Sequence, residues 1–261
     1  MQNDLTMIRV CFEDRKDITI CPIADVHLGS AEFDEKKFVD FLKYIKSEQN
    51  IRVVLAGDLL NNSTRSSIAN VFQETMRPMK QKERMIELLE PIKDRILCAV
   101  SGNHERRSGK DADNDPTYDI MRCLGKQDVY RENMSFLHIQ MGNAKNNGET
   151  NPAYMVGITH GAGGGSTIGA SVNRSEKFAW AIEGLDVLIT GHTHKPSVAP
   201  TYRLVTDPRT GKVYLRKTYV VVCSSWLNYG GYAMEKMMPP CGNVIQKITL
   251  GGKKKSIEVI M

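Results

Sequence analysis

Histidine, aspartate and asparagine residues gather at the ends of apolar segments in this sequence. Each of five apolar runs, which have the pattern of buried strands, is followed at once by one or two such residues. The five segments are ADVHLG (24–29), AGDLLN (56–61), SGNHER (101–106), ITHG (158–161) and ITGHTHKP (189–196). They supply eight side chains with metal-binding or acid–base chemistry: Asp25, His27, Asp58, Asn103, His104, His160, His192 and His194.

This combination of residue types indicates a metal centre. A lone histidine or aspartate at a strand end is more often a turn residue, but burying so many polar groups together without a cation would cost several kcal/mol per group. Imidazole, carboxylate and one amide oxygen, with no thiolate, suit manganese first, and also iron, zinc or nickel. The set is too large for one ion and fits two ions about 3.5–4 Å apart, which is the arrangement that hydrolyses phosphate esters.

The geometry of the paired residues follows from the backbone expected for them. Residues i and i+2 of an extended segment point to the same side. We therefore expect Asp25 and His27 to project as one pair, and His192 and His194 as another. The one histidine outside these five segments, His138, lies inside an apolar run and is interpreted as an ordinary strand residue.

The bulk composition is that of a soluble globular chain. With 261 residues, 41% of them hydrophobic and 25% charged, the chain can form one large domain over residues 1–261. Six scattered cysteines without a CxxC pair favour a reducing, cytoplasmic location. The first residues lack the pattern of a signal peptide and no apolar run is long enough for a membrane span, so we expect no membrane partner. The net charge of +5 is compatible with a polyanionic substrate, although a solvated basic surface explains it equally simply.

The elements that must position these residues alternate between strands and helices. Apolar runs predict early strands over 7–12, 17–25, 51–58 and 95–103, and later strands over 134–141, 153–161, 186–192, 201–206 and 213–225. Helices are predicted over 33–50, 66–90 with a kink or a split at Pro78, 115–124 and 175–183, with an exposed loop over 106–114. This order favours one α/β or α+β domain with layered sheets and helices outside.

The motifs D-x-H, G-D, G-N-H-[D/E], H and G-H-x-H occur here in that order between Asp25 and His194. In this they resemble the calcineurin-like metallophosphoesterase superfamily. The resemblance implies a four-layer sandwich of two mixed β-sheets flanked by helices. It also implies two divalent metal ions, the first held by Asp25, His27, Asp58 and His194, and the second by Asp58, Asn103, His160 and His192. In that scheme Asp58 bridges the ions, a metal-bridging hydroxide attacks phosphorus, and His104 protonates the leaving oxygen or stabilises the transition state.

Departures from the superfamily's branches narrow the function. Asn62 stands where the phosphoprotein phosphatases carry a phosphate-gripping arginine, so that branch is disfavoured. The segment DVHLG is more similar to the SbcD-type DNA nucleases, but those typically have GNHD and a further DNA-capping domain, and only 67 residues follow His194 here. We therefore expect a phosphodiester hydrolase, with a DNA nuclease as the alternative. A catalytically silent scaffold is less favoured because every ligand position and His104 are filled. A nucleic-acid-binding module with structural metals is disfavoured because the ligand set leaves open coordination positions.

Three basic residues and two further segments have two interpretations each. Arg106, Arg107 and Lys195 are candidates to contact a phosphate substrate, although Arg106 could instead pair with Glu105. The glycine-rich segment 160–171 is either a mobile loop that passes the site or a substrate lid. The methionine-rich segment 232–240 is expected to pack on the core, with a partner surface as the alternative. The sequence leaves the natural substrate and the oligomeric state open.

Overall fold

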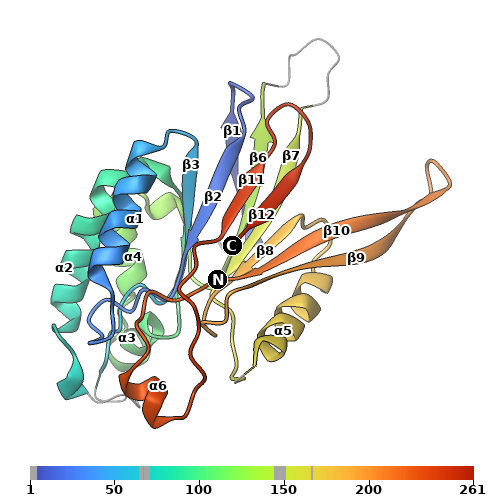
Figure 1. Ribbon diagram of the computed structural model, residues 1–261. Helices are drawn as coiled ribbons and strands as arrows, with labels where there is room; N and C mark the ends of the chain where they lie inside the picture. The colour runs from blue at the N-terminus through green and yellow to red at the C-terminus, as the bar shows by residue number, and fades with distance from the viewer. Residues whose placement is uncertain (1–4, 65–66, 68–70, 144–150, 166) are drawn as a thin grey trace.

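Two six-stranded mixed sheets lie face to face in the computed structural model, which describes residues 5–64, 67, 71–143, 151–165 and 167–261 (Figure 1). The first sheet has the order β1 (Met7–Phe12), β6 (Met134–Met141), β7 (Ala153–Thr159), β8 (Val187–Thr190), β10 (Lys212–Val222) and β9 (Ser197–Asp207). The second has the order β12 (Ile257–Ile260), β11 (Lys247–Leu250), β2 (Ile18–Ile23), β3 (Ile51–Ala56), β4 (Ile96–Val100) and β5 (Tyr130–Arg131).

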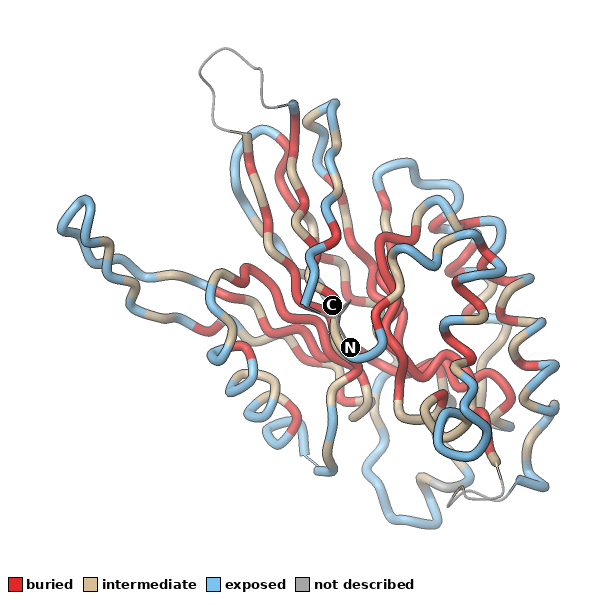
Figure 2. The backbone as a smooth tube through the Cα atoms, turned by 180° about the vertical axis from the view of Figure 1, so that it is seen from behind, coloured by how far each residue is buried: buried red, intermediate tan, exposed pale blue. Residues whose placement is uncertain are grey.

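Helices cover the outer face of each sheet, which makes four layers. The α-helices are α1 (Glu35–Ser47), α2 (Pro78–Leu89), α3 (Glu105–Ala112), α4 (Pro116–Cys123), α5 (Ile168–Trp180) and the short α6 (Gly231–Glu235). Helices α1, α2 and α4 pack with β3 in one apolar cluster, and α5 packs on β8 and β10 in another. A third cluster fills the space between the sheets, and Figure 2 shows the resulting run of buried backbone through the middle of the molecule. The expected four-layer sandwich of two mixed sheets is confirmed.

The first helix illustrates how local sequence sets these elements. The side chain of Asp34 accepts a hydrogen bond from the Lys37 backbone N–H, which satisfies an otherwise unpaired donor at the helix start. Phe38 and Ile45, at helical spacing, are fully buried against the second sheet. The cap and the buried stripe agree with the sequence pattern.

Parallel pairing brings the chemically important strand ends together. Strands β2, β3 and β4 are parallel neighbours, and so are β7, β8 and β10 in the other sheet. The carboxyl ends of parallel strands meet at one edge of a sheet, so the five polar segments converge from both sheets. The charged turn over 13–17 takes the chain from β1 in one sheet to β2 in the other.

Three predictions about the helices are wrong. The helix predicted over 66–90 begins at Pro78, because proline lacks an N–H and holds Arg77 before it in an extended conformation. Upstream, Val71–Gln73 forms only a 3₁₀ turn and Phe72 is 93% exposed, while Ile68 lies outside the described residues. Residues 105–112 form helix α3 instead of a loop, because the buried Glu105 anchors its first turn. Helix α5 begins at Ile168, seven residues before the predicted Ser175, with Thr167 as its cap.

The last part of the chain and the character of the helices complete the fold. Met237 is 90% exposed and Met234 is 60% exposed, so the expectation that segment 232–240 packs on the core is wrong. Segment 251–256 joins β11 and β12 as a hairpin connection. None of the helices in the described ranges has the length and apolar character needed to cross a membrane.

We expect the substitution D115A to lower the free energy of unfolding by about 2 kcal/mol. Asp115 accepts hydrogen bonds from the backbone N–H groups of Thr117 and Tyr118 at the start of α4, and from the Tyr130 hydroxyl. Losing a cap costs about 1 kcal/mol, and leaving the half-buried Tyr130 hydroxyl with only Ser101 Oγ as a neighbour adds up to a similar amount. Urea denaturation measures the change. The matched variant D115N keeps an acceptor at the cap and should lose less than half as much; equal losses would show that the cap does not stabilise α4.

Candidate metal centre

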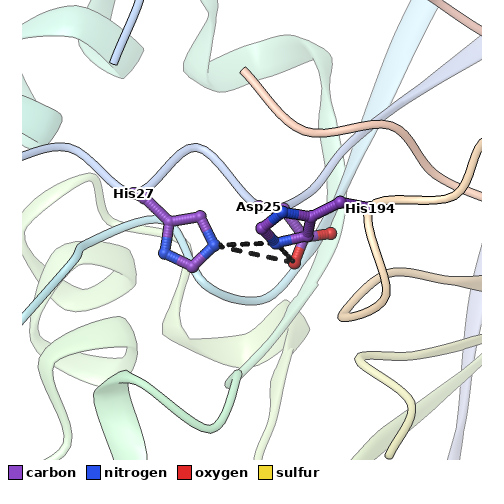
Figure 3. A group of neighbouring side chains, drawn as sticks. All are labelled: Asp25, His27 and His194. Atoms are coloured by element: carbon purple, nitrogen blue, oxygen red, sulfur yellow. Dashed lines mark hydrogen bonds and ion pairs between the residues drawn. The ribbon is translucent and has the colours of Figure 1, made fainter. Parts of the chain in front are cut away.

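The end of β2 and the loop after β8 form the first group of candidate ligands (Figure 3). His27 Nε2 lies 3.0 Å from His194 Nε2, and His194 Nε2 lies 3.2 Å from Asp25 Oδ1. Asp25 is fully buried, His27 is 3% exposed, and their ligand atoms with that of His194 all lie within 4.8 Å of one another. One cation could contact all three side chains.

A second group forms where the ends of β3, β4, β7 and β8 meet. Asn103 Oδ1 lies 2.9 Å from His160 Nε2 and 2.7 Å from His192 Nδ1. His160 Nε2 is also 3.2 Å from Asp58 Oδ2. Asp58, His160 and His192 together have the spacing of a cation site, and the amide oxygen of Asn103 adds a fourth ligand atom.

Asp58 connects the two groups. Its Oδ2 atom lies 3.2 Å from His160 Nε2 in the second group and 3.9 Å from His27 Nε2 in the first. His104 Nε2 is 3.8 Å from the same oxygen, so His27, Asp58 and His104 form a third possible cluster. The structure therefore brings together all eight of the polar side chains from the five segments, with a carboxylate at their centre.

The backbone that carries these residues is not extended, so the premise for the two predicted pairs was wrong: Asp25 and His27 do lie in one group, but His192 and His194 do not. Asp25, His27, His192 and His194 have φ angles of 52°, 50°, 73° and 55°, and Asp58 has 51°. Non-glycine residues in this left-handed region cost about 1–3 kcal/mol each and concentrate at functional sites. The strands end before these residues, and the turns send His192 to one group and His194 to the other.

Backbone hydrogen bonds to the two carboxylates hold these turns in place. The His192 N–H donates to both oxygens of Asp25, each at 3.0 Å. The His104 N–H donates to Asp58 Oδ1 at 2.8 Å. Each carboxylate thus keeps its other lone pairs directed toward the imidazoles, where a cation would lie.

Glu105 is a site residue that the sequence reasoning considered only as a partner for Arg106. It is fully buried, and its Oε2 accepts from the backbone N–H groups of Asp58 and Gly102, both at 3.0 Å. Its Oε1 accepts from the Leu60 N–H at 2.9 Å. Burial and the neighbouring Asp58 charge raise the pKa of Glu105 to about 7. The Glu105 carboxyl group thereby links segment 56–61 to segment 101–106. The sequence feature that could have indicated this role is a glutamate directly after G-N-H.

Two of the imidazoles, His27 and His192, are held in the neutral form that metal binding requires, whereas His160 carries a proton that would have to leave when a cation binds. Burial, followed by the charge of His104, holds the pKa of His27 well below its usual value, and burial followed by His160 lowers the pKa of His192. Burial alone would raise the pKa of Asp58, but the charges of His160 and His104 hold it well below its usual value. Burial opposes protonation of His160 as well, yet Asp58 raises the pKa of that imidazole to about 9.

The donor set fits a divalent cation. Neutral imidazoles offer lone pairs, and ionised carboxylates need a compensating charge when they are buried. His27 Nδ1 is buried with no hydrogen-bond partner among the described residues, so only Nε2 of that ring faces its neighbours. Two inward-facing nitrogens 3.0 Å apart, on His27 and His194, are better satisfied by a shared cation than by each other.

His104 occupies a different position from the other imidazoles. Its Nδ1 lies 2.8 Å from the Asn61 carbonyl oxygen, which fixes the ring and leaves Nε2 toward Asp58. The Asn62 amide donates to the His104 carbonyl and to Ser108 Oγ, so this 1% exposed residue supports α3. Burial lowers the pKa of His104, an effect that the charge of Asp58 opposes.

The three basic residues predicted to contact phosphate have different surroundings. Arg106 donates to the Ser101 carbonyl at 2.9 Å and to the Glu132 carbonyl at 3.4 Å. Lys195 is 7% exposed and its ammonium donates to the Pro239 carbonyl and to Cys241 Sγ. Arg107 donates to the Asn61 carbonyl at 3.3 Å, which is the carbonyl that also binds His104. Arg107 is therefore the basic residue that lies beside His104.

Comparisons with known proteins give a family match and several similar solved structures. The family described as calcineurin-like phosphoesterase matches residues 18–196, and a comparison with curated protein sequences gives no match. Similar solved structures include a conserved Streptococcus pneumoniae protein described as a predicted phosphoesterase (12% identity, 94% of this chain and 97% of that chain, TM-score 0.38). Others are the calcineurin-like phosphoesterase YfkN from Bacillus subtilis (14%, 94% and 90%, 0.41) and Vps29 from Chaetomium thermophilum (11%, 93% and 97%, 0.41).

The family match covers most of the chain. It begins at the first residue of β2 and ends two residues after His194, so it contains all five polar segments. The chain belongs to the calcineurin-like phosphoesterase family.

Proposed function

We propose that this protein is a dinuclear metal-dependent phosphoesterase that hydrolyses phosphodiesters. The observation that carries the proposal is the position of Asp58, a buried carboxylate between two groups of imidazoles that each have the spacing of a cation site. Asp25, His27, Asp58 and His194 would hold one ion, and Asp58, Asn103, His160 and His192 the other. Manganese is the first candidate for both sites, with iron, zinc and nickel as the other metals that suit these ligands.

The chain's own residues divide the remaining work. When bound, two cations supply a nucleophilic water at neutral pH and neutralise charge on the phosphoryl oxygens. His104 in its cationic form, which burial opposes and the Asp58 charge favours, would hold a proton at Nε2 for the leaving oxygen, while its Nδ1–H donates to the Asn61 carbonyl and keeps the ring oriented. Glu105 would keep the second and third motifs at a fixed separation through its three backbone hydrogen bonds.

The charge around the site favours a diester over a monoester. A phosphate monoester carries about one more negative charge than a diester at neutral pH, because its second pKa is about 6. The ammonium of Lys195 and the guanidinium of Arg106 are bound to other groups, and Asn62 is committed to supporting α3. Arg107 also donates to a carbonyl, that of Asn61, but this bond places its guanidinium beside His104, where its other N–H groups would contact a phosphate oxygen, and one such cation suits a singly charged diester.

We expect metal-stripped protein to be inactive and to regain hydrolysis of bis(p-nitrophenyl) phosphate when manganese is added. Metal analysis should show two manganese ions per chain, because the candidate ligands form two groups joined by Asp58. The variant D58N should lose at least 100-fold in kcat/KM together with metal affinity. The matched control H138A, which changes a histidine of β6 outside these groups, should stay within twofold of the wild type. Protein that holds two ions and hydrolyses neither mono- nor diesters would contradict the proposed function.

We expect H104A to keep both ions and lose about 10²–10⁴-fold in kcat, since that is the usual contribution of a positioned general acid. The loss should be larger for substrates with poor leaving groups such as methoxide than for p-nitrophenolate, because a good leaving group needs no proton. Metal content is measured on the same samples. If H104A loses an ion as well, His104 is a ligand in the third cluster and its assignment as the acid is wrong.

The choice of substrate distinguishes a DNA nuclease from a hydrolase of small phosphodiesters. Single- and double-stranded DNA are incubated with the manganese-loaded protein beside bis(p-nitrophenyl) phosphate. Cleavage of DNA at rates comparable to the chromogenic diester would identify a nuclease. Hydrolysis of the chromogenic diester alone would assign the protein to small phosphodiesters.

A further inference from the structure

A cavity of about 240 Å³ lies beside the candidate metal centre, between residues 161–164, here called the glycine-rich loop, and α5. Figure 1 shows α5 packed next to the ends of β7 and β8, where that loop leaves the first sheet. The walls include Gly161 to Gly164 from the loop, Ser171, Arg174 and Phe178 from α5, and Gly191 and Thr193 from the loop after β8.

The cavity shares a wall with the candidate metal centre. Gly161 directly follows His160 in the chain, and Gly191 and Thr193 flank His192 on both sides. A phosphate group at the metal centre that these histidines would form therefore places an attached ester group within reach of the cavity. The elements of the wall are also joined to one another, because Ser175 Oγ of α5 lies 3.1 Å from Thr190 Oγ1 at the end of β8.

The chemistry of the walls suits an uncharged group. Phe178 supplies an aromatic ring, and the glycines expose backbone instead of side chains. The hydroxyls of Ser171 and Thr193 are buried with no hydrogen-bond partner in the described part of the chain, and Ser171 is only 4% exposed. These oxygens have almost no accessible surface, so the cavity presents the Phe178 ring and the glycine backbone to an occupant instead of hydroxyl groups.

The one charged residue on the cavity wall is used to shape the loop. The Arg174 guanidinium donates to the Ala162 carbonyl at 2.9 Å and lies over Gly163. A Cβ atom at Gly163 would meet Arg174 Nη1 at 1.1 Å, so a glycine is required for this contact. The loop is thereby fastened to α5, which gives the cavity a defined wall.

We propose that this cavity binds the organic ester group of the substrate, and that this group is a flat, uncharged aromatic ring of the size of a nucleobase. The inference rests on the proposed function, because the phosphate would sit on the metal centre next to it. The volume is below the roughly 300–1,000 Å³ of pockets that enclose a whole small molecule, so it fits one ring system and leaves the phosphate outside. Phe178 would stack on that ring, and the backbone of the glycines would lie against it.

The inference is tested by ligand binding instead of turnover, with probes that share a phosphonate group and differ in the group attached to it. Calorimetry with manganese-loaded protein compares methylphosphonate, phenylphosphonate and the phosphonate analogue of adenosine 5′-monophosphate. We expect phenylphosphonate to bind at least tenfold more tightly than methylphosphonate. The adenosine analogue identifies the source of the ring: tighter binding than phenylphosphonate indicates nucleotide esters, and weaker binding indicates simple aryl esters.

Two variants, each with a matched control, test whether the cavity causes the preference for phenylphosphonate over methylphosphonate. G164L fills the cavity at a position where a Cβ meets no atom within 4 Å, and F178A removes the ring. Both should bring the phenyl-to-methyl preference below threefold while leaving the Kd of methylphosphonate unchanged. G169L is equally open but lies outside the cavity wall, and I168A removes an exposed apolar side chain from the same helix; both should keep the preference.

The possible failures have different signatures. Equal binding of the two simple phosphonates by the wild type, or a preference that survives in both G164L and F178A, would overturn the cavity as a subsite and leave the metal centre standing. If no phosphonate binds although the protein hydrolyses bis(p-nitrophenyl) phosphate, the cavity is not a subsite. If hydrolysis of that diester fails as well, the proposed function itself is overturned.

Discussion

Two buried carboxylates impose the constraint on which the rest of this structure depends. Asp25 is fully buried and Asp58 is 2% exposed, and they lie where the carboxyl ends of strands from both sheets meet. An ionised carboxylate in such a place is stable only when hydrogen bonds and opposite charge surround it. The N–H groups of His192 and His104 provide part of that compensation, and both come from other segments of the chain. The Asp25 bond thus links the two sheets, and the Asp58 bond links two neighbouring strand ends of the second sheet.

The close approach of these segments explains the glycines in the motifs. A Cβ atom at Gly102 would lie 2.0 Å from Asp58 Oδ1, and one at Gly191 would lie 2.6 Å from Asp25 Oδ2. Gly57 combines a φ of +85° with backbone contact to Gly102. Each glycine lets a carboxylate approach the neighbouring turn closely enough to accept its hydrogen bonds. Replacing any of these glycines would push the ligand side chains apart, even though the ligands themselves are unchanged.

Local patterns predicted the elements, and long-range contacts decided the rest. Apolar runs placed the strands, and the spacing of polar residues after them gave the set of side chains that meets at the site. The left-handed turns at Asp25 and His192 could not be predicted, because they depend on a hydrogen bond between residues 167 positions apart. Helix α3 was missed for a similar reason: its sequence is polar throughout, and it is anchored by the bonds of Glu105 to the backbones of Asp58 and Leu60.

The site is asymmetric, and this bears on how a diester would be oriented. His104 approaches from α3 beside the second sheet, whereas the cavity lies against α5 beside the first sheet, and Figure 1 shows these helices on opposite sides of the strand ends. An acid must lie next to the oxygen that leaves, and in-line displacement places that oxygen opposite the attacking water. With both proposals, the ester group beside His104 is the one released, and the ring in the cavity belongs to the product that keeps the phosphate. The two sheets would then contribute different functions to one reaction: the second sheet supports the departure of one group, and the first retains the other.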